Sequence, residues 1–206
     1  MKNMKNMNRK KMTNVKPIVY KIVFMGDSGV GKTSVALRIS CNTFVPNGEA
    51  TIGASYCSKI IYKDDIQYNF NIWDTAGQEK YRCLVPLYYK NSDAAIIVYD
   101  ITNKRSFENA KKNVLELRKN TELSVILFIG NKCDDAIRRE VETKEASEYC
   151  EDAGLLYGET SAKLNINIKD LLQNILDKLP LPIIKEDITK LTSPDDTWRQ
   201  SCCNII

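Results

Sequence analysis

A glycine-rich octapeptide near the N-terminus constrains this chain more than any other feature. Residues 26–33 read GDSGVGKT, which fits the pattern G-x-x-x-x-G-K-[ST]. An apolar, β-rich run over 19–25 precedes it, and apolar residues at helical spacing follow it over 33–40. A strand, a glycine-rich loop and a helix in this order form a cradle in which backbone N–H groups and the helix N-terminus bind phosphates. We therefore predict an α/β protein that binds a nucleoside phosphate.

The residue types within this loop predict individual roles. Lys32 reaches the β- and γ-phosphate oxygens, and Thr33 is a ligand of Mg²⁺. The other expected contacts to the phosphates come from Ser28, Gly29, Val30, Gly31 and Ser34. ATPases, kinases and GTPases all use such a loop, so the motif alone leaves these three classes open.

Strand and helix patterns alternate along the rest of the chain. Residues 66–72 alternate apolar and polar side chains, whereas 94–99 and 125–129 are continuous apolar runs, typical of strands that are covered on both faces. Apolar stripes at helical spacing predict helices over 107–117 and over 168–179, the second ending before a proline. Such alternation predicts a mostly parallel sheet with helices on both faces.

The composition fits one globular domain with an extension at each end. A length of 206 residues with 43% hydrophobic residues is enough for a single core. Residues 1–17 hold six basic side chains and no acid, whereas the remaining chain carries 24 basic and 26 acidic side chains. The positive charge therefore belongs to an N-terminal tail, and a nucleic-acid-binding body is not indicated. We expect the domain over 18–181 and flexible tails over 1–17 and 182–206.

Two other classes of protein are excluded. No apolar stretch approaches the roughly 18 residues that a membrane-spanning helix needs, and the basic N-terminus lacks the apolar region of a secretory signal. The chain has no histidine and no C-x-x-C pair, which leaves few or no parts for a zinc site or a Ser-His-Asp triad. We expect a cytosolic chain in which most of the internal cysteines are small buried apolar groups.

A second polar motif, DTAGQ at 74–78, follows the alternating strand. Asp74 stands where the carboxyl end of that strand is expected, at the edge where α/β sheets bind ligands. A carboxylate there suits the Mg²⁺ of a phosphate site. The N–H of Gly77 can reach the γ-phosphate, and Gln78 can hold a water in line for attack, because phosphoryl transfer depends mostly on positioning and charge stabilisation.

Two motifs after later strands indicate which base is bound. They are NKCD at 131–134 and ETSAK at 159–163. The Asp134 carboxylate can accept from N1–H and from the exocyclic amine of guanine, and the N–H of Ala162 can meet guanine O6. Adenine lacks both of the donors that Asp134 requires, at a cost of about 1–3 kcal/mol per missing partner in a dry site. GTP and GDP are therefore the predicted ligands. The other expected base and ribose contacts come from Asn131, Lys132, Ser161 and Lys163.

Taken together, these motifs resemble the small GTPases of the Rab family over about residues 17–181. Phe44, twelve residues after Lys32, resembles the aromatic residue beside the base. Thr51, nineteen residues after Lys32, resembles the switch I threonine that binds Mg²⁺ and the γ-phosphate. The resemblance implies a three-layer P-loop NTPase fold, the small G domain, with a mostly parallel six-stranded sheet. It also implies catalytic roles for Lys32, Thr51, Gly77 and Gln78 and a metal site of Thr33, Thr51 and Asp74.

Three segments indicate the Rab branch rather than its Ras or Rho relatives. They read TIGASY at 51–56, WDTAGQEKY at 73–81 and LYYK at 87–90. Within the Rabs, VPLYY at 85–89 and VYDIT at 98–102 are most similar to the early-endosomal group.

Three aromatic residues resemble the triad that Rab effectors contact, and they are Tyr56, Trp73 and Tyr88. Apolar anchors on segments that the γ-phosphate orders are what a switchable interface needs, although these residues also fit an ordinary core. The chain departs from the early-endosomal pattern at Tyr56, where that group usually has Phe, and at Ser55, where it has Ala. Ser28 and Gly29 also differ from its usual phosphate loop.

The chain ends in CCNII, in which Cys202 and Cys203 resemble the double-cysteine prenylation signal of Rabs. Two prenyl chains anchor stably to a membrane, whereas one does so only marginally. The resemblance thus implies a monomeric switch on the cytosolic face of endosomes and vesicles that cycles with the cytosol. It also implies an exchange factor, a GTPase-activating protein, a dissociation inhibitor, a prenyltransferase with its escort, and effectors of the GTP state.

Three alternatives stay open at this point. The first is a Rab that acts in secretory-pathway transport instead of endosome fusion. The second is a nucleotide-binding interaction module without significant turnover, against which Gln78 argues. The third is a P-loop ATPase or small-molecule kinase, against which the NKCD motif argues.

Overall fold

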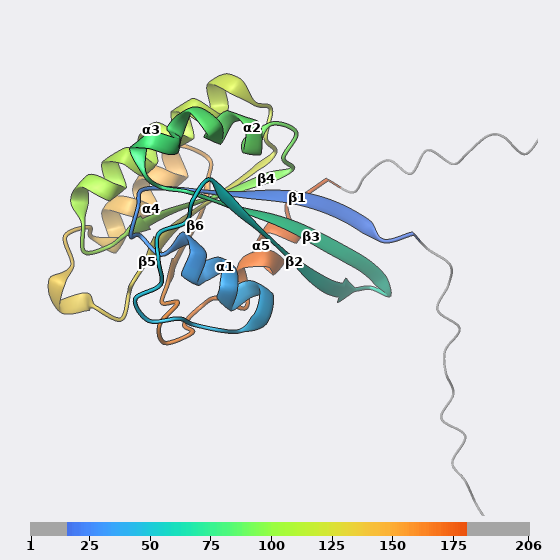
Figure 1. Cartoon of the computed structure of the whole chain (residues 1–206), viewed down its shortest axis with the longest axis horizontal. Helices are drawn as coiled ribbons and strands as arrows, with labels where there is room; N and C mark the ends of the chain where they lie inside the picture. The colour runs from blue at the N-terminus through green and yellow to red at the C-terminus, as the bar shows by residue number, and fades with distance from the viewer. Residues whose placement is uncertain (1–15, 181–206) are drawn as a thin grey trace, which may run out of the picture.

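The structure is a computed structural model that describes residues 16–180, where a six-stranded sheet lies between two layers of helices (Figure 1). The strands follow the order β2-β3-β1-β4-β5-β6, and only the pairing of β2 with β3 is antiparallel. The predicted class, a mostly parallel six-stranded sheet with helices on both faces, is therefore confirmed.

The strands are β1 (Ile18–Met25), β2 (Ala54–Lys63), β3 (Ile66–Thr75), β4 (Ala94–Asp100), β5 (Val125–Asn131) and β6 (Leu156–Thr160). The helices are α1 (Lys32–Cys41), α2 (Val85–Tyr89), α3 (Lys104–Asn120), α4 (Thr143–Asp152) and α5 (Leu171–Leu176). Two short 3₁₀ helices, η1 (Glu79–Leu84) and η2 (Ala136–Arg138), complete the described elements.

Each face of the sheet carries its own hydrophobic core, because successive side chains of a strand point to opposite faces. Along β1, Ile22 and Phe24 pack in the core that contains α1 and α5, whereas Val23 and Met25 pack in the core that contains α3 and α4. Strands β4 and β5 are buried over their whole lengths, as their continuous apolar runs predict.

The last helix is shorter than the sequence pattern predicts. The apolar stripe indicated a helix over 168–179, but α5 is regular only over Leu171–Leu176. Ile168 is buried ahead of the helix, and turn bonds from Lys178 and Leu179 to the Ile175 carbonyl continue beyond it. The stripe thus identified the buried side chains correctly, whereas the helix ends were wrong, because burial does not require regular helical bonds.

The expectation that most internal cysteines are buried is wrong. Cys150 is buried, Cys57 and Cys133 are half-buried, and Cys41 and Cys83 are exposed. The two exposed thiols lie at the end of α1 and in η1, where the chain turns at the surface. The exposure of these two thiols is therefore determined by their position at the surface and not by the apolar character of cysteine.

Most of the two predicted tails lies outside the described residues, as do Cys202 and Cys203, so their assignments stay predictions. Over residues 16–180, none of the helices combines the length and the apolar character that crossing a bilayer requires.

The parallel strands bring the sequence motifs to one edge of the sheet. The glycine-rich loop follows β1, Asp74 lies at the end of β3, Asn131 ends β5, and Ser161 follows β6. Carboxyl ends of parallel strands share an edge, which is where open α/β sheets bind ligands. The fold thus assembles a single site from segments more than 100 residues apart.

Candidate functional site

Two glycines shape the loop between β1 and α1. A Cβ atom on Gly26 would lie 2.2 Å from the Val98 carbonyl oxygen, and one on Gly31 would lie 2.3 Å from Asn131 Nδ2. Both residues also have positive φ angles, 144° and 96°, which L side chains rarely adopt. The loop can therefore follow this path, and present its N–H groups inward, only with glycine at these positions.

This loop lines a cavity of about 340 Å³, a size within the range of small-ligand sites. The cavity is bounded on its other sides by the segment after α1 and by the start of the segment after β3. The structure thus brings the predicted catalytic residues to one space, whose lining includes Lys32, Thr51, Gly77 and Gln78. The predicted phosphate contacts Ser28, Gly29, Gly31, Thr33 and Ser34 also line it.

Lys32 is a buried cation at the base of this cavity, with only 5% of its surface exposed. Its ammonium donates to the Asp27 carbonyl oxygen at 2.8 Å. Burial lowers the pKa of Lys32 to about 8, although the carboxylates of Asp74 and Asp27 oppose this shift. A buried ammonium with this little compensation favours an added anion, which is what a phosphate supplies.

Asp74 is a buried carboxylate with one satisfied and one unsatisfied oxygen. Its Oδ2 accepts from the Thr33 hydroxyl at 2.7 Å and from the Ser55 hydroxyl at 3.2 Å. Its Oδ1 is buried and has no hydrogen-bond partner among the described residues. Burial raises the pKa of Asp74, since removal from water disfavours the charged form, while the hydroxyls and the Lys32 ammonium act in the opposite direction.

The three predicted metal ligands converge around this carboxylate. The hydroxyl oxygens of Thr33 and Thr51 are 2.8 Å apart, and the Thr51 hydroxyl lies 3.5 Å from Asp74 Oδ2. Mg²⁺ prefers hard oxygen ligands and is usually held by one or two protein groups together with substrate phosphates. The orphaned Asp74 Oδ1 and the paired hydroxyls therefore fit this ion.

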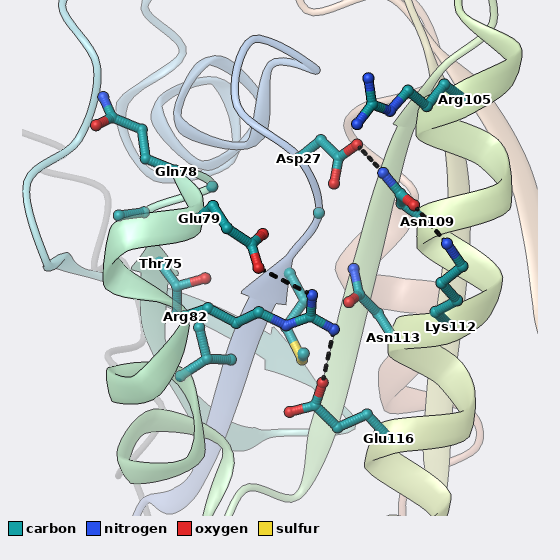
Figure 2. A pocket seen from close by; sticks show the side chains of 15 residues that line it. Asp27, Thr75, Gln78, Glu79, Arg82, Arg105, Asn109, Lys112, Asn113 and Glu116 are labelled. Carbon is teal, nitrogen blue, oxygen red and sulfur yellow. Dashed lines mark hydrogen bonds and ion pairs between the residues drawn. The ribbon is translucent and has the colours of Figure 1, made fainter.

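Gly77 brings the segment after β3 directly against the phosphate loop. A Cβ atom at this position would lie 2.4 Å from both the carbonyl carbon of Asp27 and the nitrogen of Ser28, so only glycine permits the approach. The next residue, Gln78, lines the phosphate cavity and also a second cavity of about 310 Å³ on the α3 side (Figure 2).

A polar network crosses this second cavity. Figure 2 shows the Arg82 guanidinium between Glu79 and Glu116, at N···O distances of 3.2 and 3.8 Å, which joins η1 to α3. On the other side, Asn109 Nδ2 donates to Asp27 Oδ2 at 2.8 Å and so ties α3 to the phosphate loop. Sequence reasoning missed these residues because charged and amide side chains opposite an apolar helical stripe look like an ordinary solvated face.

Asn131 joins the phosphate loop to the segment after β6. Its side chain is almost fully buried, and its Nδ2 donates to the Val30 carbonyl oxygen at 2.8 Å. Its Oδ1 accepts from the Thr160 hydroxyl at 3.2 Å and from the Ala162 N–H at 3.3 Å. The predicted phosphate and base regions are therefore connected through one amide.

The remaining base-site residues lie beside Asn131. The Ser161 hydroxyl donates to Asp134 Oδ1 at 2.5 Å, which orients the carboxylate expected to bind guanine. The Lys132 ammonium pairs with Asp100 Oδ2 at 2.6 Å, so only its stem remains for the predicted contact along the base. The contacts of these residues to a ligand stay predictions.

Phe44 and Lys163 both contact Arg38, a residue that the motifs did not indicate. Phe44 is half-buried against the core, and the Arg38 guanidinium lies 5.7 Å from its ring centre. The same guanidinium donates to the Lys163 carbonyl oxygen at 3.1 Å. Arg38 lies in the last turn of α1, where a basic residue at sequence level indicates only a helix end, so nothing in the pattern points to this role.

The three predicted effector residues form one aromatic cluster. The ring centres of Tyr56 and Trp73 are 5.6 Å apart, and those of Trp73 and Tyr88 are 5.7 Å apart. Tyr56 is 56% exposed, and its hydroxyl donates to Asn71 Oδ1 at 2.8 Å. The cluster therefore belongs partly to the surface, although its role toward effectors stays a prediction.

Comparison with known proteins agrees with this arrangement. The family model of the Ras family matches residues 21–180. The chain is 44% identical over 198 residues to the Ras-related protein Rab-5A of Dictyostelium discoideum, a match that covers 93% of this chain and 98% of that protein. It is 41% identical over 193 residues to the Ras-related protein RABF2b of Arabidopsis thaliana, with 91% and 96% of the two chains covered.

The position of Asn131 leads to a prediction about stability. Asn131→Ala leaves the Val30 carbonyl, the Thr160 hydroxyl and the Ala162 N–H without this partner in a buried setting. We expect the free energy of unfolding to fall by roughly 1–3 kcal/mol in urea denaturation. The control Asn120→Ala removes one exposed bond to the Glu116 carbonyl and is expected to cost less than about 0.5 kcal/mol. Equal losses in the two variants would contradict the assigned role.

Proposed function

Because the chain belongs to the Ras family of small GTPases, we propose that it is a Rab-type switch of endocytic transport that recruits effectors in its GTP state. As a member of this family it binds guanine nucleotide and hydrolyses GTP to GDP. One observation carries the proposal: a single cavity gathers Lys32, Thr51 and Gln78 beside a buried carboxylate with an unsatisfied oxygen.

The phosphates bind at the N-terminus of α1. The positive φ angles of the loop glycines let its N–H groups face the phosphate oxygens, and the helix dipole favours negative charge there. Lys32 holds its ammonium at the same place, where burial penalises it until an anion arrives. Binding of the triphosphate therefore relieves a cost that is built into the empty site.

We assign Mg²⁺ to the hydroxyls of Thr33 and Thr51 and to Asp74. When held by these residues, Mg²⁺ would supply positive charge that offsets the negative charge of the bound phosphates. Ser55 supports this site by donating to Asp74 Oδ2. The other carboxylate oxygen, Oδ1, has no hydrogen-bond partner among the described residues. The early-endosomal group usually has Ala at this position. Ser55 therefore adds a hydrogen bond to the proposed metal-binding carboxylate that an alanine could not make.

Hydrolysis requires a water positioned for in-line attack on the γ-phosphate. Gln78 borders the phosphate cavity and can orient that water, while the Gly77 N–H can donate to a γ-phosphate oxygen. Arg82 is engaged by Glu79 and Glu116 on the α3 side, so it does not act as an arginine finger in this arrangement. A slow unassisted rate follows, and a GTPase-activating protein that inserts an arginine would accelerate it.

The base is selected by Asp134, whose orientation is held by Ser161. A carboxylate that accepts from both N1–H and the 2-amino group binds guanine and leaves adenine without those contacts. We expect Phe44 and the stem of Lys132 to flank the base and the Ala162 N–H to donate to O6. The Ala162 N–H contacts Asn131 in the structure, so guanine must share or replace this bond.

The two nucleotide states are read at the cluster of Tyr56, Trp73 and Tyr88. These residues lie on β2, β3 and α2, next to the segments that hold Thr51 and Gln78. Prenyl groups on Cys202 and Cys203 hold the protein on the cytosolic face of endosomes. An exchange factor, a dissociation inhibitor and a prenyltransferase with its escort complete the cycle.

The hydrolysis step is tested by Gln78→Leu in single-turnover assays with GTP and Mg²⁺. We expect the wild type to release phosphate at about 10⁻⁴ to 10⁻² per second. Loss of water positioning should slow Gln78→Leu at least about tenfold without weakening GTP binding. Gln67→Leu is the matched control, because Gln67 bonds Asn69 far from the cavity. A wild-type rate no higher than that of Gln78→Leu would favour a binding module without turnover.

Base selection is tested by Asp134→Asn, which replaces an acceptor with an amide. We expect GTP affinity to fall about a hundredfold or more and xanthosine triphosphate to become the preferred ligand. Asp135→Asn is the neighbouring control, since Asp135 pairs with Arg138 at the surface. Isothermal titration with GTP, XTP and ATP decides the matter, and tight binding of ATP by the wild type would refute the base assignment.

Membrane attachment is tested by the double substitution Cys202→Ser/Cys203→Ser. We expect the fluorescently tagged wild type on endosomal membranes and the variant in the cytosol, because no prenyl group can then be attached. Cys41→Ser, which changes an exposed thiol within the described residues, is the control and should stay on membranes. Unchanged membrane recovery of the double variant would rule out the lipid anchor.

A further inference from the structure

Arg38 binds two segments that are more than 100 residues apart in the sequence. It lies in the second half of α1, and its Nε donates to the Ala162 carbonyl oxygen at 2.7 Å and its Nη2 to the Lys163 carbonyl oxygen at 3.1 Å. Its Nη1 donates to the Asn42 carbonyl oxygen at 2.9 Å. All three partners are backbone carbonyls, so the planar guanidinium restrains the backbone of both segments.

The first pair of carbonyls belongs to the segment that recognises the base. Ala162 supplies the N–H expected to meet guanine O6, and the preceding Ser161 orients Asp134. The Ser161 N–H and carbonyl also bond Ile166, which closes the segment into a narrow loop. Fixing two successive carbonyls from the outside therefore restrains the peptide groups that face the base.

The third carbonyl belongs to the start of the segment that carries Phe44 and Thr51. Asn42 caps α1 in the left-handed region, with φ 55°, and its N–H returns a bond to the Arg38 carbonyl. Two residues later, the Phe44 ring lies 5.7 Å from the Arg38 guanidinium, within the range of a cation–π contact. Arg38 thus bonds to both sides of the expected base pocket.

We propose that Arg38 is a positioning residue of the guanine site that controls how long nucleotide is retained. The inference rests on the proposed guanine-nucleotide site. Release of the base requires the 161–166 loop and the segment after Asn42 to separate, and Arg38 holds both. A partner that pulls on the segment after Asn42 also breaks the Arg38 bond there and loosens the loop, which provides a route to accelerated exchange.

A purely structural role for Arg38 leads to a different expectation. A basic residue in the last turn of a helix stabilises that helix by interacting with its free carbonyls. If this were the only role of Arg38, its loss would lower the free energy of unfolding. It would not accelerate nucleotide release while leaving hydrolysis unchanged. The phosphate cavity with Gln78 has no direct bond to Arg38, so hydrolysis of bound GTP is an internal reference.

The experiment compares Arg38→Met and Arg38→Lys with the wild type, each loaded with fluorescent GDP. We expect GDP to dissociate from Arg38→Met at least about tenfold faster, equivalent to about 1.4 kcal/mol. The GDP dissociation rate of Arg38→Lys should lie between those of the wild type and Arg38→Met. The lysine ammonium keeps the positive charge near Phe44 but cannot bond all three carbonyls at once, as the planar guanidinium does. The rate constant for hydrolysis of bound GTP should change less than about twofold.

Two control variants separate this effect from other consequences of the substitution. Arg118→Met removes an arginine that donates to the Ala153 carbonyl away from the site. Lys169→Met removes a cation from the cavity that Arg38 itself lines, without a bond to the base loop. Both should release GDP at the wild-type rate.

Wild-type release from Arg38→Met, or equal acceleration in Arg118→Met, would overturn the proposal, as would parallel changes in GDP release and GTP hydrolysis. If Arg38→Met fails to fold, Arg38→Lys decides by the same comparison. A wild type that does not retain GDP would count against the proposed function itself. A wild type that retains GDP and does not depend on Arg38 counts against this inference alone.

Discussion

The buried amide of Asn131 is the interaction on which the rest of the site depends. Its donor holds the Val30 carbonyl of the phosphate loop, and its acceptor holds Thr160 and Ala162 after β6. The amide occupies the space that a Cβ atom on Gly31 would need, so the Asn131 side chain fits here only because residue 31 is a glycine. The predicted phosphate and base regions lie more than 100 residues apart in the sequence, and this side chain connects them. Arg38 braces the same loop from its outer side through the Ala162 and Lys163 carbonyls.

The second constraint is electrostatic, because the site buries charges that the protein alone does not satisfy. Lys32 is nearly fully buried with its pKa lowered to about 8, and Asp74 is buried with its pKa raised and one oxygen without a partner among the described residues. Each shift disfavours the charged form of its group, so both groups would gain from an added partner of opposite charge. A triphosphate with a divalent cation supplies both partners at once. The same buried charges that destabilise the empty site therefore favour binding of the ligand.

Local sequence determined those parts of the site in which chemistry and spacing act over a few residues. The glycine-rich loop, Asp74 after an alternating strand and Asn131 after an apolar run all lie where the pattern indicated, because a strand end and a tight turn are local events. Arg38, Asn109 and Arg82 could not be found in this way. Their partners are backbone carbonyls or polar side chains that only the tertiary fold brings near, and bonds of that kind leave no period in the sequence. The end of α5 was missed for a related reason, since apolar spacing reports burial and not regular hydrogen bonding.

The alternation of side chains along two strands explains how a change at the proposed metal site can alter the surface of the protein. On β2, Ser55 bonds the Asp74 carboxylate, whereas the next residue, Tyr56, packs edge-on against Trp73. On β3, Trp73 and Asp74 are also neighbours, and β2–β3 pairing sets Tyr56 opposite Trp73 and Ser55 opposite Asp74. Successive side chains point to opposite faces, so one pair contacts the ligand side while the other contacts the aromatic cluster. A shift of either strand that follows loss of contacts at Asp74 therefore moves Tyr56 and Trp73 with it. The coupling needs no long pathway, because the two surfaces are the two faces of the same pair of strands.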